Sequence, residues 1–353
     1  MSLRVGQEVQ ALPRQAELTP PVPRIHVVAG VLQDEAGDVL VAQRPPGKSL
    51  AGGWEFPGGK LAAGEGRLEG LARELEEELG IRLDPASCRP LIRYVHRYPE
   101  RVVELDVWRV GAWNGELHGR ENQALDWRRP EVLLASGLLP ADAPVVNALQ
   151  LPPLVAVTPA AGGDDEGGFL DRLEVLAHSS GPALVCLRRP DLDPARLLEL
   201  AAGAACRVDG TVARLLLHGD PGRLAEALDA APPMLRRRLD PALAGIHAPG
   251  RYLEPVERRP LPPGLWLGFS CHDARQLERA LQAGATYAFL GPARETASHP
   301  GQPGMGWARF EALVRELPLP VYAIGGLGPA DLETAWTHGA QGIAAIRGLW
   351  PAA

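Results

Sequence analysis

The chain has 353 residues, 46% of them hydrophobic, which exceeds what one domain usually needs and suits large buried cores. Its 36 basic and 43 acidic residues give a formal charge of -7, which argues against binding along a nucleic acid backbone. The four cysteines form no C-x-x-C pair, and no apolar run suits a signal peptide or a membrane span. We therefore expect a cytoplasmic protein with reduced thiols, no membrane contact and no direct nucleic-acid binding.

The first half of the chain predicts an α/β domain over residues 24–150, preceded by a flexible tail over residues 1–23. Two β-branched runs at 25–32 and 38–44 surround a turn and predict a hairpin. A stripe of leucines predicts a helix over 66–79, with Gly80 as its C-cap. Strands are then predicted at 91–98 and 101–110, and the segments 126–134 and 142–150 close the domain with a terminal helix.

The second half of the chain has a different rhythm, which begins after Leu151, Pro152 and Pro153. Short apolar runs alternate there with helix-like segments such as 274–284 and 330–339. Strands buried on both faces and separated by helices indicate a parallel α/β architecture, and eight of them close a TIM (β/α)8 barrel over residues 151–353. The runs are 154–160, 183–189, 213–219, 243–249, 265–271, 286–292, 320–326 and 342–348.

The predicted helix of the first domain carries a dense set of glutamates. Glu74, Glu77 and Glu78 are spaced at i, i+3 and i+4, so their carboxylates gather on one helix face, opposite the leucines. Such a cluster is costly unless a cation offsets it, and Mg²⁺ is the usual cation beside phosphates, with Mn²⁺ as a substitute. The alternative is an ordinary solvated helix face, which is the interpretation we keep for Glu76.

Neighbouring residues complete the pattern. Arg73 can brace one of the carboxylates, and Glu65 lies just before the helix, where a negative charge is favourable, so we expect it to be structural more than catalytic. Gly58 and Gly59 permit a close approach of the backbone, and a carbonyl at Gly58 could complete a metal shell. Metal ions held there would favour hydrolysis of a phosphoanhydride.

The spacing from Gly59 through Glu65 to the run Arg73–Ile81 fills every position of the Nudix box. The segments 54–65, 98–101, 118–123 and 139–146 resemble the MutT branch of the Nudix hydrolases, the 8-oxo-dGTP diphosphatases. The resemblance covers about residues 24–149. It implies an α/β/α sandwich with a mixed sheet and Mg²⁺-dependent removal of pyrophosphate from oxidised guanine nucleotides, converting 8-oxo-dGTP to 8-oxo-dGMP.

The same resemblance assigns roles outside the box. Glu121 resembles an additional metal-linked glutamate that orders the catalytic water, although by itself it would be read as a charged loop residue. Arg44, Phe56 and Arg101 match positions around the nucleotide, although a phenylalanine at position 56 is also an ordinary core residue. Asp142 occupies a position where the family pattern has Asn, and an ionised Asp cannot donate to a base carbonyl. Base selectivity is therefore left open, adenine forms included.

The second domain resembles the thiamine-phosphate synthase and TenI superfamily. The resemblance rests on the segments 245–247, 268–272, 284–296, 323–326 and 342–348. It implies a phosphate site made by the backbone at Gly325, Gly326 and Gly348, the alternative being ordinary tight turns.

Several positions of the second domain depart from that family's pattern. Arg188 and Arg189 are followed by Pro190 where the pattern has Lys, and His299 stands in place of another Lys. The segment 245–252 lacks the expected acid, and Pro292 replaces the TenI histidine. Cys271 and His272 suggest a catalytic pair, but a lone His near a strand end is more often just hydrogen-bonded. We expect a catalytically degenerate barrel that still binds a phosphorylated ligand.

Three functional hypotheses follow. In the first, the first domain hydrolyses nucleoside triphosphates in nucleotide-pool sanitation, and the barrel is an accessory module. In the second, the protein is a thiamine-pathway diphosphate hydrolase whose barrel is active or binds a thiamine-type phosphate. In the third, the barrel is a binding or oligomerisation surface without catalysis. A homodimer is left open in all three.

Overall fold

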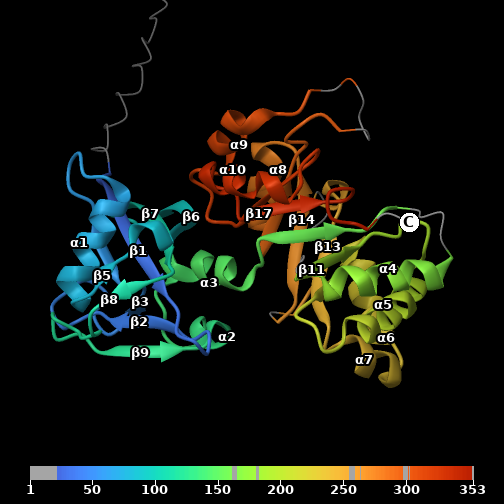
Figure 1. Ribbon diagram of the computed structural model, residues 1–353, viewed down its shortest axis with the longest axis horizontal. Helices are drawn as coiled ribbons and strands as arrows, with labels where there is room; N and C mark the ends of the chain where they lie inside the picture. The colour runs from blue at the N-terminus through green and yellow to red at the C-terminus, as the bar shows by residue number, and fades with distance from the viewer. Residues whose placement is uncertain are drawn as a thin grey trace, which may run out of the picture.

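The computed structural model describes residues 22–160, 165–179, 183–253, 259–262, 264–296, 301 and 303–351. Two bodies of secondary structure lie on either side of residues 151–153 (Figure 1). The tail predicted over 1–23 lies almost wholly outside the described ranges, as does His299. Within these ranges, no helix is both long and apolar enough to cross a membrane.

Two main sheets form the N-terminal body. The first contains β1 Arg24–Leu32, β4 Gly58–Lys60, β6 Cys88–Arg97 and β7 Val102–Val110, and the second β2 Val39–Gln43, β3 Trp54–Glu55 and β9 Leu125–Arg128. The first sheet has the order β4-β1-β7-β6 and is mixed, because β1 and β7 run parallel whereas the other pairs are antiparallel. The mixed sheet expected for this domain is therefore confirmed. A short antiparallel pair joins β5 Arg82–Leu83 to β8 Trp113–Asn114.

The hairpin predicted from 25–32 and 38–44 is wrong, although both strands exist. Strand β1 pairs with β4 and β7, whereas β2 pairs with β3 and β9, so consecutive strands belong to different sheets. They meet only at one bridge between Gln33 and Val39, beside the turn. The short turn keeps the ends of the two strands close but does not make the strands pair along their length. The buried residues of each strand instead pack within its own sheet.

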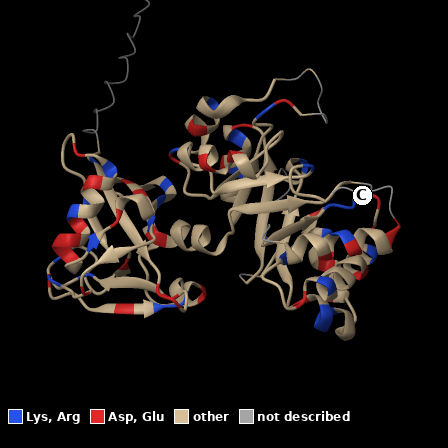
Figure 2. Cartoon of the chain, in the orientation of Figure 1, with Lys and Arg blue, Asp and Glu red and all other residues tan. Residues whose placement is uncertain are grey.

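The predicted glutamate-bearing helix is α1 Arg67–Leu79. Leu71, Leu75 and Leu79 are 0% exposed and pack beneath it, each stabilising the fold by roughly 1.5–3 kcal/mol relative to an exposed side chain. The helix ends at Gly80, whose φ of 75° is the left-handed C-cap conformation that the sequence predicted. Acidic residues are frequent along α1 (Figure 2). The helix packs against β1 and β4, and Glu74 and Glu78, which flank the leucine stripe, lie next to the glycine strand.

The remaining helices of this body follow β9. They are α2 Pro130–Leu133 and α3 Ala143–Gln150, with the 3-10 turn η2 Pro140–Asp142 between them; another 3-10 turn, η1 Pro85–Ser87, lies earlier, between β5 and β6. Helix α3 packs on β6 and leads directly into the second body.

The C-terminal body is a closed barrel of parallel strands. The strands follow chain order around it, from β10 to β17, and β17 pairs again with β10. All eight predicted strands are present, within shorter bounds, because each run ends in turn residues. They are β10 Leu154–Val157, β11 Leu184–Leu187, β12 Arg214–His218, β13 Leu243–Ala248, β14 Trp266–Cys271, β15 Tyr287–Leu290, β16 Val321–Ile324 and β17 Gly342–Ala345.

Helices surround the barrel. They are α4 Glu166–His178, α5 Pro194–Val208, α6 Pro221–Ala230, α7 Pro233–Leu239, α8 Ala274–Gln282, α9 Gly306–Val314 and α10 Leu332–Thr337, with the turns η3 Gly250–Tyr252 and η4 Pro329–Asp331. Asp residues cap α4, α5, α6 and α8 by accepting from backbone N–H groups of the first turn.

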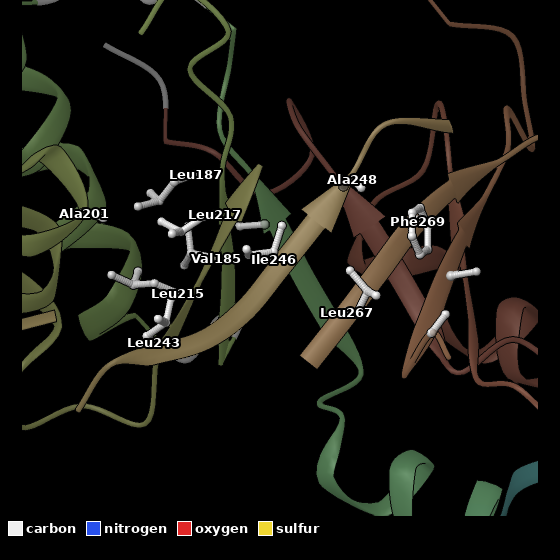
Figure 3. Close-up of a cluster of buried hydrophobic side chains, with 14 of the residues drawn as sticks. Val185, Leu187, Ala201, Leu215, Leu217, Leu243, Ile246, Ala248, Leu267 and Phe269 are labelled. Carbon is white, nitrogen blue, oxygen red and sulfur yellow. The ribbon is translucent and has the colours of Figure 1, made fainter. Parts of the chain in front are cut away.

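Side chains alternate between two cores along the barrel strands. Val185 and Leu217 point outward and meet Ala201 of α5 (Figure 3). Tyr287, Phe289 and Tyr322 belong to the separate inner core. Successive residues of a strand face opposite sides, so strands with continuous apolar sequence are buried on both faces.

Direct contacts hold the two bodies together. Gln341 donates from Nε2 to the carbonyl oxygens of Ala148 and Leu151, both at 2.9 Å. Arg24 pairs with Glu316 at 2.7 Å, and the backbone N–H of Val95 donates to the Glu316 carbonyl. The end of α3 and the linking segment are therefore anchored to the barrel.

Candidate active site

Glycines on strand β4 allow helix α1 to approach it closely. Gly58 has a φ of +149°, and a Cβ there would lie 2.1 Å from the carbonyl oxygen of Val28. A Cβ on Gly59 would lie 2.2 Å from a carboxylate oxygen of Glu74. Only glycine fits at position 58, because the backbone of the neighbouring strand fills the space, whereas a side chain at position 59 would displace the carboxylate of Glu74.

Two glutamates of α1 reach this strand. The carboxylate of Glu74 lies over Gly59, and Glu78 accepts a 3.1 Å hydrogen bond from the backbone N–H of Gly58. Their spacing of four residues places them on the same face of the helix, as predicted. The strand and the helix together hold two carboxylates at the edge of the sheet.

Arg73 fixes the positions of three carboxylates. Its guanidinium donates to both oxygens of Glu65 at 2.8 and 2.9 Å, to Glu74 at 2.9 Å and to Glu77 at 3.2 Å. The bidentate bond from Arg73 lowers the pKa of Glu65 to about 2. Glu65 also accepts from the backbone N–H of Ala62, which agrees with a structural role.

Glu77 is placed differently from Glu74 and Glu78. Its side chain is 59% exposed and bonds Arg73, and it does not line the cavity that Glu74 and Glu78 face. Among the described residues, no group of three or more His, Cys, Asp or Glu side chains is gathered as it would be around a metal ion. The three predicted carboxylates thus share a helix face, but only two reach the cavity.

A cavity of about 600 Å³ opens in front of these two carboxylates. It lies between β1, β4, β7 and the loops that follow β2 and α2, within the size range of small-molecule sites. The predicted site residues on its wall are Arg44, Gly58, Glu74, Glu78, Arg101, Glu121 and Asp142. Segments far apart in the sequence therefore meet here.

The predicted aromatic wall at Phe56 is not found. Phe56 is 3% exposed and packs in the core with Tyr94 and Val145. Its neighbour Glu55 lines the cavity instead, because consecutive residues of an extended segment point to opposite sides. The aromatic side chain that does line the cavity is Tyr98, which the sequence reasoning missed.

Lys48 is the second residue that the sequence reasoning missed. It lines the cavity and forms an ion pair with Glu121, which follows Arg120, whose backbone N–H donates to the carbonyl of Glu78 at the end of α1. Burial raises the pKa of Glu78 to about 7, helped by the negative charges of Glu121 and Glu55 and opposed by the Gly58 N–H. Burial therefore disfavours the ionised form of Glu78.

The other end of the cavity combines an acid with basic and aromatic groups. Asp142 is 5% exposed, and burial together with the charge of Glu55 raises the pKa of its carboxyl well above the ordinary value. The guanidinium of Arg101 lies 4.9 Å from the centre of the Tyr98 ring. Arg44 forms an ion pair with Glu55 and donates to the carbonyl of Ser49.

The donor set fits a hard divalent cation. Glu74 and Glu78 offer carboxylate oxygens to the cavity beside the backbone of Gly58, and Glu121 lines the same cavity while paired with Lys48. Burial, with a smaller contribution from the charges of Glu121 and Glu55, raises the pKa of Glu78, and a cation beside it would favour the ionised form. Oxygen-only ligands beside arginines for phosphates match the preference of Mg²⁺.

In the barrel, the predicted phosphate glycines lie in loops that follow the last two strands. Gly325 and Gly326 follow β16 with φ values of 106° and 68°. A Cβ on Gly348 would lie 2.7 Å from the carbonyl oxygen of Leu327, so this loop packs against the loop after β16. The backbone geometry requires glycine at these positions, and phosphate binding there stays a prediction.

A smaller basic cavity lies at the carboxyl ends of β11, β12 and β13. It has a volume of about 220 Å³ and is lined by Arg188, Arg189, His218, Arg223 and Arg251, among others. Arg189 forms an ion pair with Asp191 at 2.6 Å. Burial and nearby arginines lower the pKa of His218 to about 4, so His218 is neutral at pH 7.

The suggested pair of Cys271 and His272 does not form a reactive site. Cys271 is buried, and burial raises the pKa of its thiol to about 12. His272 Nδ1 bonds the carbonyl oxygen of Gly291 at 2.6 Å. This agrees with the expectation that the histidine is hydrogen-bonded rather than catalytic.

The first domain holds a polar cavity faced by glutamates and arginines, and it is joined to a (β/α)8 barrel. Residues 28–148 match the NUDIX domain family, and residues 154–349 match the family described as thiamine monophosphate synthase. The chain therefore belongs to the Nudix family through its first domain and to the thiamine monophosphate synthase family through its second.

Individual relatives match one domain each. CTP pyrophosphohydrolase of Escherichia coli (strain K12) is 39% identical over 35% of this chain and 90% of that protein. An 8-oxo-dGTP diphosphatase of Haemophilus influenzae is 38% identical over 35% of this chain and 90% of that protein. A putative thiamine-phosphate synthase of Geobacter sulfurreducens is 31% identical over 52% of this chain and 82% of that protein. The first domain is thus a MutT-like nucleotide pyrophosphohydrolase, and the second is thiamine-phosphate synthase-like.

Proposed function

We propose that the first domain hydrolyses 8-oxo-dGTP to 8-oxo-dGMP and pyrophosphate. The observation that carries this proposal is the position of Asp142, buried in the wall of the cavity that Glu74 and Glu78 also face. Burial raises the pKa of Asp142 and so favours its protonated form, which offers one donor and one acceptor, as an Asn amide does.

This donor and acceptor pair distinguishes nucleobases. 8-Oxoguanine carries a hydrogen on N7 beside the O6 acceptor, whereas unmodified guanine presents two acceptors on that edge. A neutral Asp142 can accept from N7–H and donate to O6, but it cannot pair twice with the unmodified edge. Cytosine, with its N4 donor beside the N3 acceptor, also fits a carboxylic acid, so CTP is the main competitor.

The chain's own residues divide the remaining tasks. Arg44 and Arg101 face the cavity as cations for the phosphates, and Tyr98 offers a ring face for a base. Arg73 holds Glu65, Glu74 and Glu77, and the Gly58 N–H holds Glu78, so that Glu74 and Glu78 are set before substrate arrives. Glu121, which also lines the cavity, would orient a water molecule.

A divalent metal ion is typical of the family. We propose that Glu74, Glu78, Glu121 and the Gly58 backbone hold Mg²⁺, or Mn²⁺ as a substitute. Bound there, the ion would neutralise the triphosphate charge and lower the pKa of a bound water.

The test is a substrate panel on the full chain. Pyrophosphate release is measured from 8-oxo-dGTP, dGTP and CTP with Mg²⁺, for the natural protein and for the Asp142→Asn and Asp142→Ala variants. We expect 8-oxo-dGTP to have the highest kcat/KM, Asp142→Asn to keep that preference, and Asp142→Ala to lose about 1–3 kcal/mol of it. A higher kcat/KM for CTP would mean that cytosine nucleotides are the preferred substrates. An unchanged preference in Asp142→Ala would mean that Asp142 does not recognise the base.

A second candidate function is a thiamine-pathway diphosphate hydrolase. It is favoured by the barrel's family and by the basic cavity at the ends of β11 to β13. Thiamine diphosphate is therefore included among the tested substrates. A kcat/KM for thiamine diphosphate above that for every nucleotide would support this candidate instead. For the barrel, we propose a ligand-binding role, because Pro190 and Pro292 stand where the family's catalytic pattern has Lys and His.

A further inference from the structure

A second large cavity lies between the two domains. Its volume is about 410 Å³, and its walls include the linking segment at Leu151, Pro152 and Pro153. The barrel contributes Arg214 and Trp266, the first residues of β12 and β14, so the cavity is at the amino end of the barrel. Active sites of such barrels lie at the opposite, carboxyl end, so this cavity is separate from both family sites.

Two arginines in its wall have no ion-pair partner among the residues that the structure describes. Among the described residues, no carboxylate lies within 4.0 Å of Arg109 or Arg214, and Glu131 attracts Arg214 only from farther away. Arg109 donates to Gln33 Oε1 and the Leu149 carbonyl, and Arg214 to the Leu243 carbonyl. Neutral acceptors hold the guanidinium groups in place but leave their charge uncompensated.

Burial makes this charge costly. It lowers the pKa of both Arg109 and Arg214 from the ordinary value, because a half-buried guanidinium is less well solvated. An anion in the cavity would compensate both charges, and guanidinium donors bind phosphate oxygens well.

Two indole rings line the same cavity. Arg214 lies 4.9 Å from the centre of the Trp266 ring, and Arg89 lies 5.1 Å from that of Trp336. Arg89 also pairs with Glu333 at 3.4 Å on the exposed rim, so its charge is partly compensated. Tryptophan faces beside arginines suit a flat ring that carries a negative group.

We propose that this interdomain cavity binds a phosphorylated flat heterocycle of the size of a nucleoside monophosphate. Its phosphate lies against Arg109 and Arg214, and its ring lies against Trp266 or Trp336. Because the walls come from both domains, the ligand stabilises their contact. The proposal goes beyond the hydrolase function and does not depend on it. Both a nucleotide and a thiamine-type phosphate have this chemistry, and the experiment compares the two.

The first experiment measures binding to the full chain in EDTA by tryptophan fluorescence and thermal unfolding. The probes are dGMP and thiamine monophosphate, with deoxyguanosine as the ring without phosphate and ribose 5-phosphate as the phosphate without ring. We expect saturable binding and a raised Tm with at least one of the first two, and at least tenfold weaker binding of the last two. No saturable binding of dGMP or thiamine monophosphate, or equal binding of ribose 5-phosphate, would overturn the proposal.

The second experiment locates the binding without disturbing the wall. Val212 lies on the rim and is 81% exposed, so a charged side chain there leaves packing intact. Val212→Lys should tighten binding and Val212→Glu weaken it, with a difference of at least threefold at low salt. Val175 on α4 is 62% exposed and provides the control variants Val175→Lys and Val175→Glu. Their affinities for the ligand should differ by less than those of the two Val212 variants.

Removal of the proposed phosphate contact completes the test. Arg214→Met keeps an apolar side chain over Trp266 but removes the charge, and should weaken binding at least tenfold. Arg207→Met is its control, because Arg207 already pairs with Asp171 and Glu174 on the outside of the barrel. The proposal is wrong if two results are found together. The Kd values of Val212→Lys and Val212→Glu would differ no more than those of Val175→Lys and Val175→Glu, and Arg214→Met would bind the ligand as tightly as the natural protein. The ligand would then lie elsewhere.

Discussion

Arg73 illustrates how single residues organise the first domain's site. One guanidinium bonds Glu65 in a bidentate manner and reaches Glu74 and Glu77 as well. Sequence reasoning expected it to brace a single carboxylate, because a linear pattern does not show that the loop before α1 folds back onto the helix. The planar fork of an arginine is what allows one side chain to serve three partners.

We predict that Arg73→Lys fails to replace Arg73. A lysine ammonium is a point charge and cannot bond both Glu65 oxygens while reaching Glu74. We expect kcat to fall about 10- to 100-fold, with little change in KM, because the residue positions ligands rather than touching substrate. Steady-state kinetics on the preferred triphosphate checks this, and a variant with full kcat would contradict the positioning role.

We predict that Glu78 lowers the stability of the metal-free protein when it is ionised. Its pKa in the folded protein is about 7, above the ordinary value of 4.5. Ionised Glu78 therefore destabilises the metal-free protein, by an amount that grows between pH 4.5 and 7 and is constant above. We expect Glu78→Gln in EDTA to raise the free energy of unfolding by about 1–3 kcal/mol at pH 8 and by almost nothing at pH 4. Urea unfolding at both pH values measures it, and equal effects at both would refute the pKa shift.

The site residues that the sequence missed share a physical reason. Lys48 and Tyr98 lie in loops whose positions depend on how β2 and β6 pair, which no local pattern specifies. Phe56 failed as a cavity residue because one step along an extended segment reverses the direction of a side chain. By contrast, Glu74 and Glu78 could be predicted, since helix spacing alone fixes their common face.

At the scale of elements, the contact between α1 and β4 sets the site. The glycines of β4 let the helix approach until Glu78 bonds the strand's backbone. The leucine stripe buries the other face, so the helix cannot rotate without exposing three buried side chains. Strand and helix thus define the site's geometry together.

We predict that Gly58→Ala destabilises the fold strongly. The new Cβ would meet the Val28 carbonyl oxygen at 2.1 Å, and the φ of +149° is unfavourable for any L side chain. We expect a loss of about 3 kcal/mol or more in the free energy of unfolding. The matched control is Gly64→Ala, where φ is +80° but nothing lies within 4 Å, with a loss of about 1 kcal/mol. Equal losses in the two variants would contradict this account of β4.

At the scale of the whole molecule, the barrel was the most predictable part. Its strands are buried on both faces, so each appears in the sequence as a short apolar run between turns. The N-terminal sheets were less predictable, because β1 and β2 are neighbours in sequence but belong to different sheets. The contact between the domains could not be predicted, since it depends on single hydrogen bonds such as those of Gln341.

We predict that Gln341→Ala weakens the contact between the domains. Its amide serves two buried carbonyl oxygens, and each unsatisfied group costs about 1–3 kcal/mol. Calorimetry should show a lower Tm and a wider separation between the unfolding of the two domains. The control is Gln282→Ala at an exposed position of α8, which should leave the thermogram unchanged. An unchanged thermogram in Gln341→Ala would mean that the hydrogen bonds do not couple the domains.

The most direct test of the central claim is pyrophosphate release from a nucleoside triphosphate by matched variants of helix α1. Glu74→Gln and Glu78→Gln remove carboxylates that face the cavity, whereas Glu76→Gln removes an exposed one that only approaches Arg82 at 3.8 Å. We predict that kcat/KM falls on the order of 100-fold or more in the first two and changes less than about twofold in the third. Comparable activity in all three variants would contradict the assignment of this helix face as the site of hydrolysis.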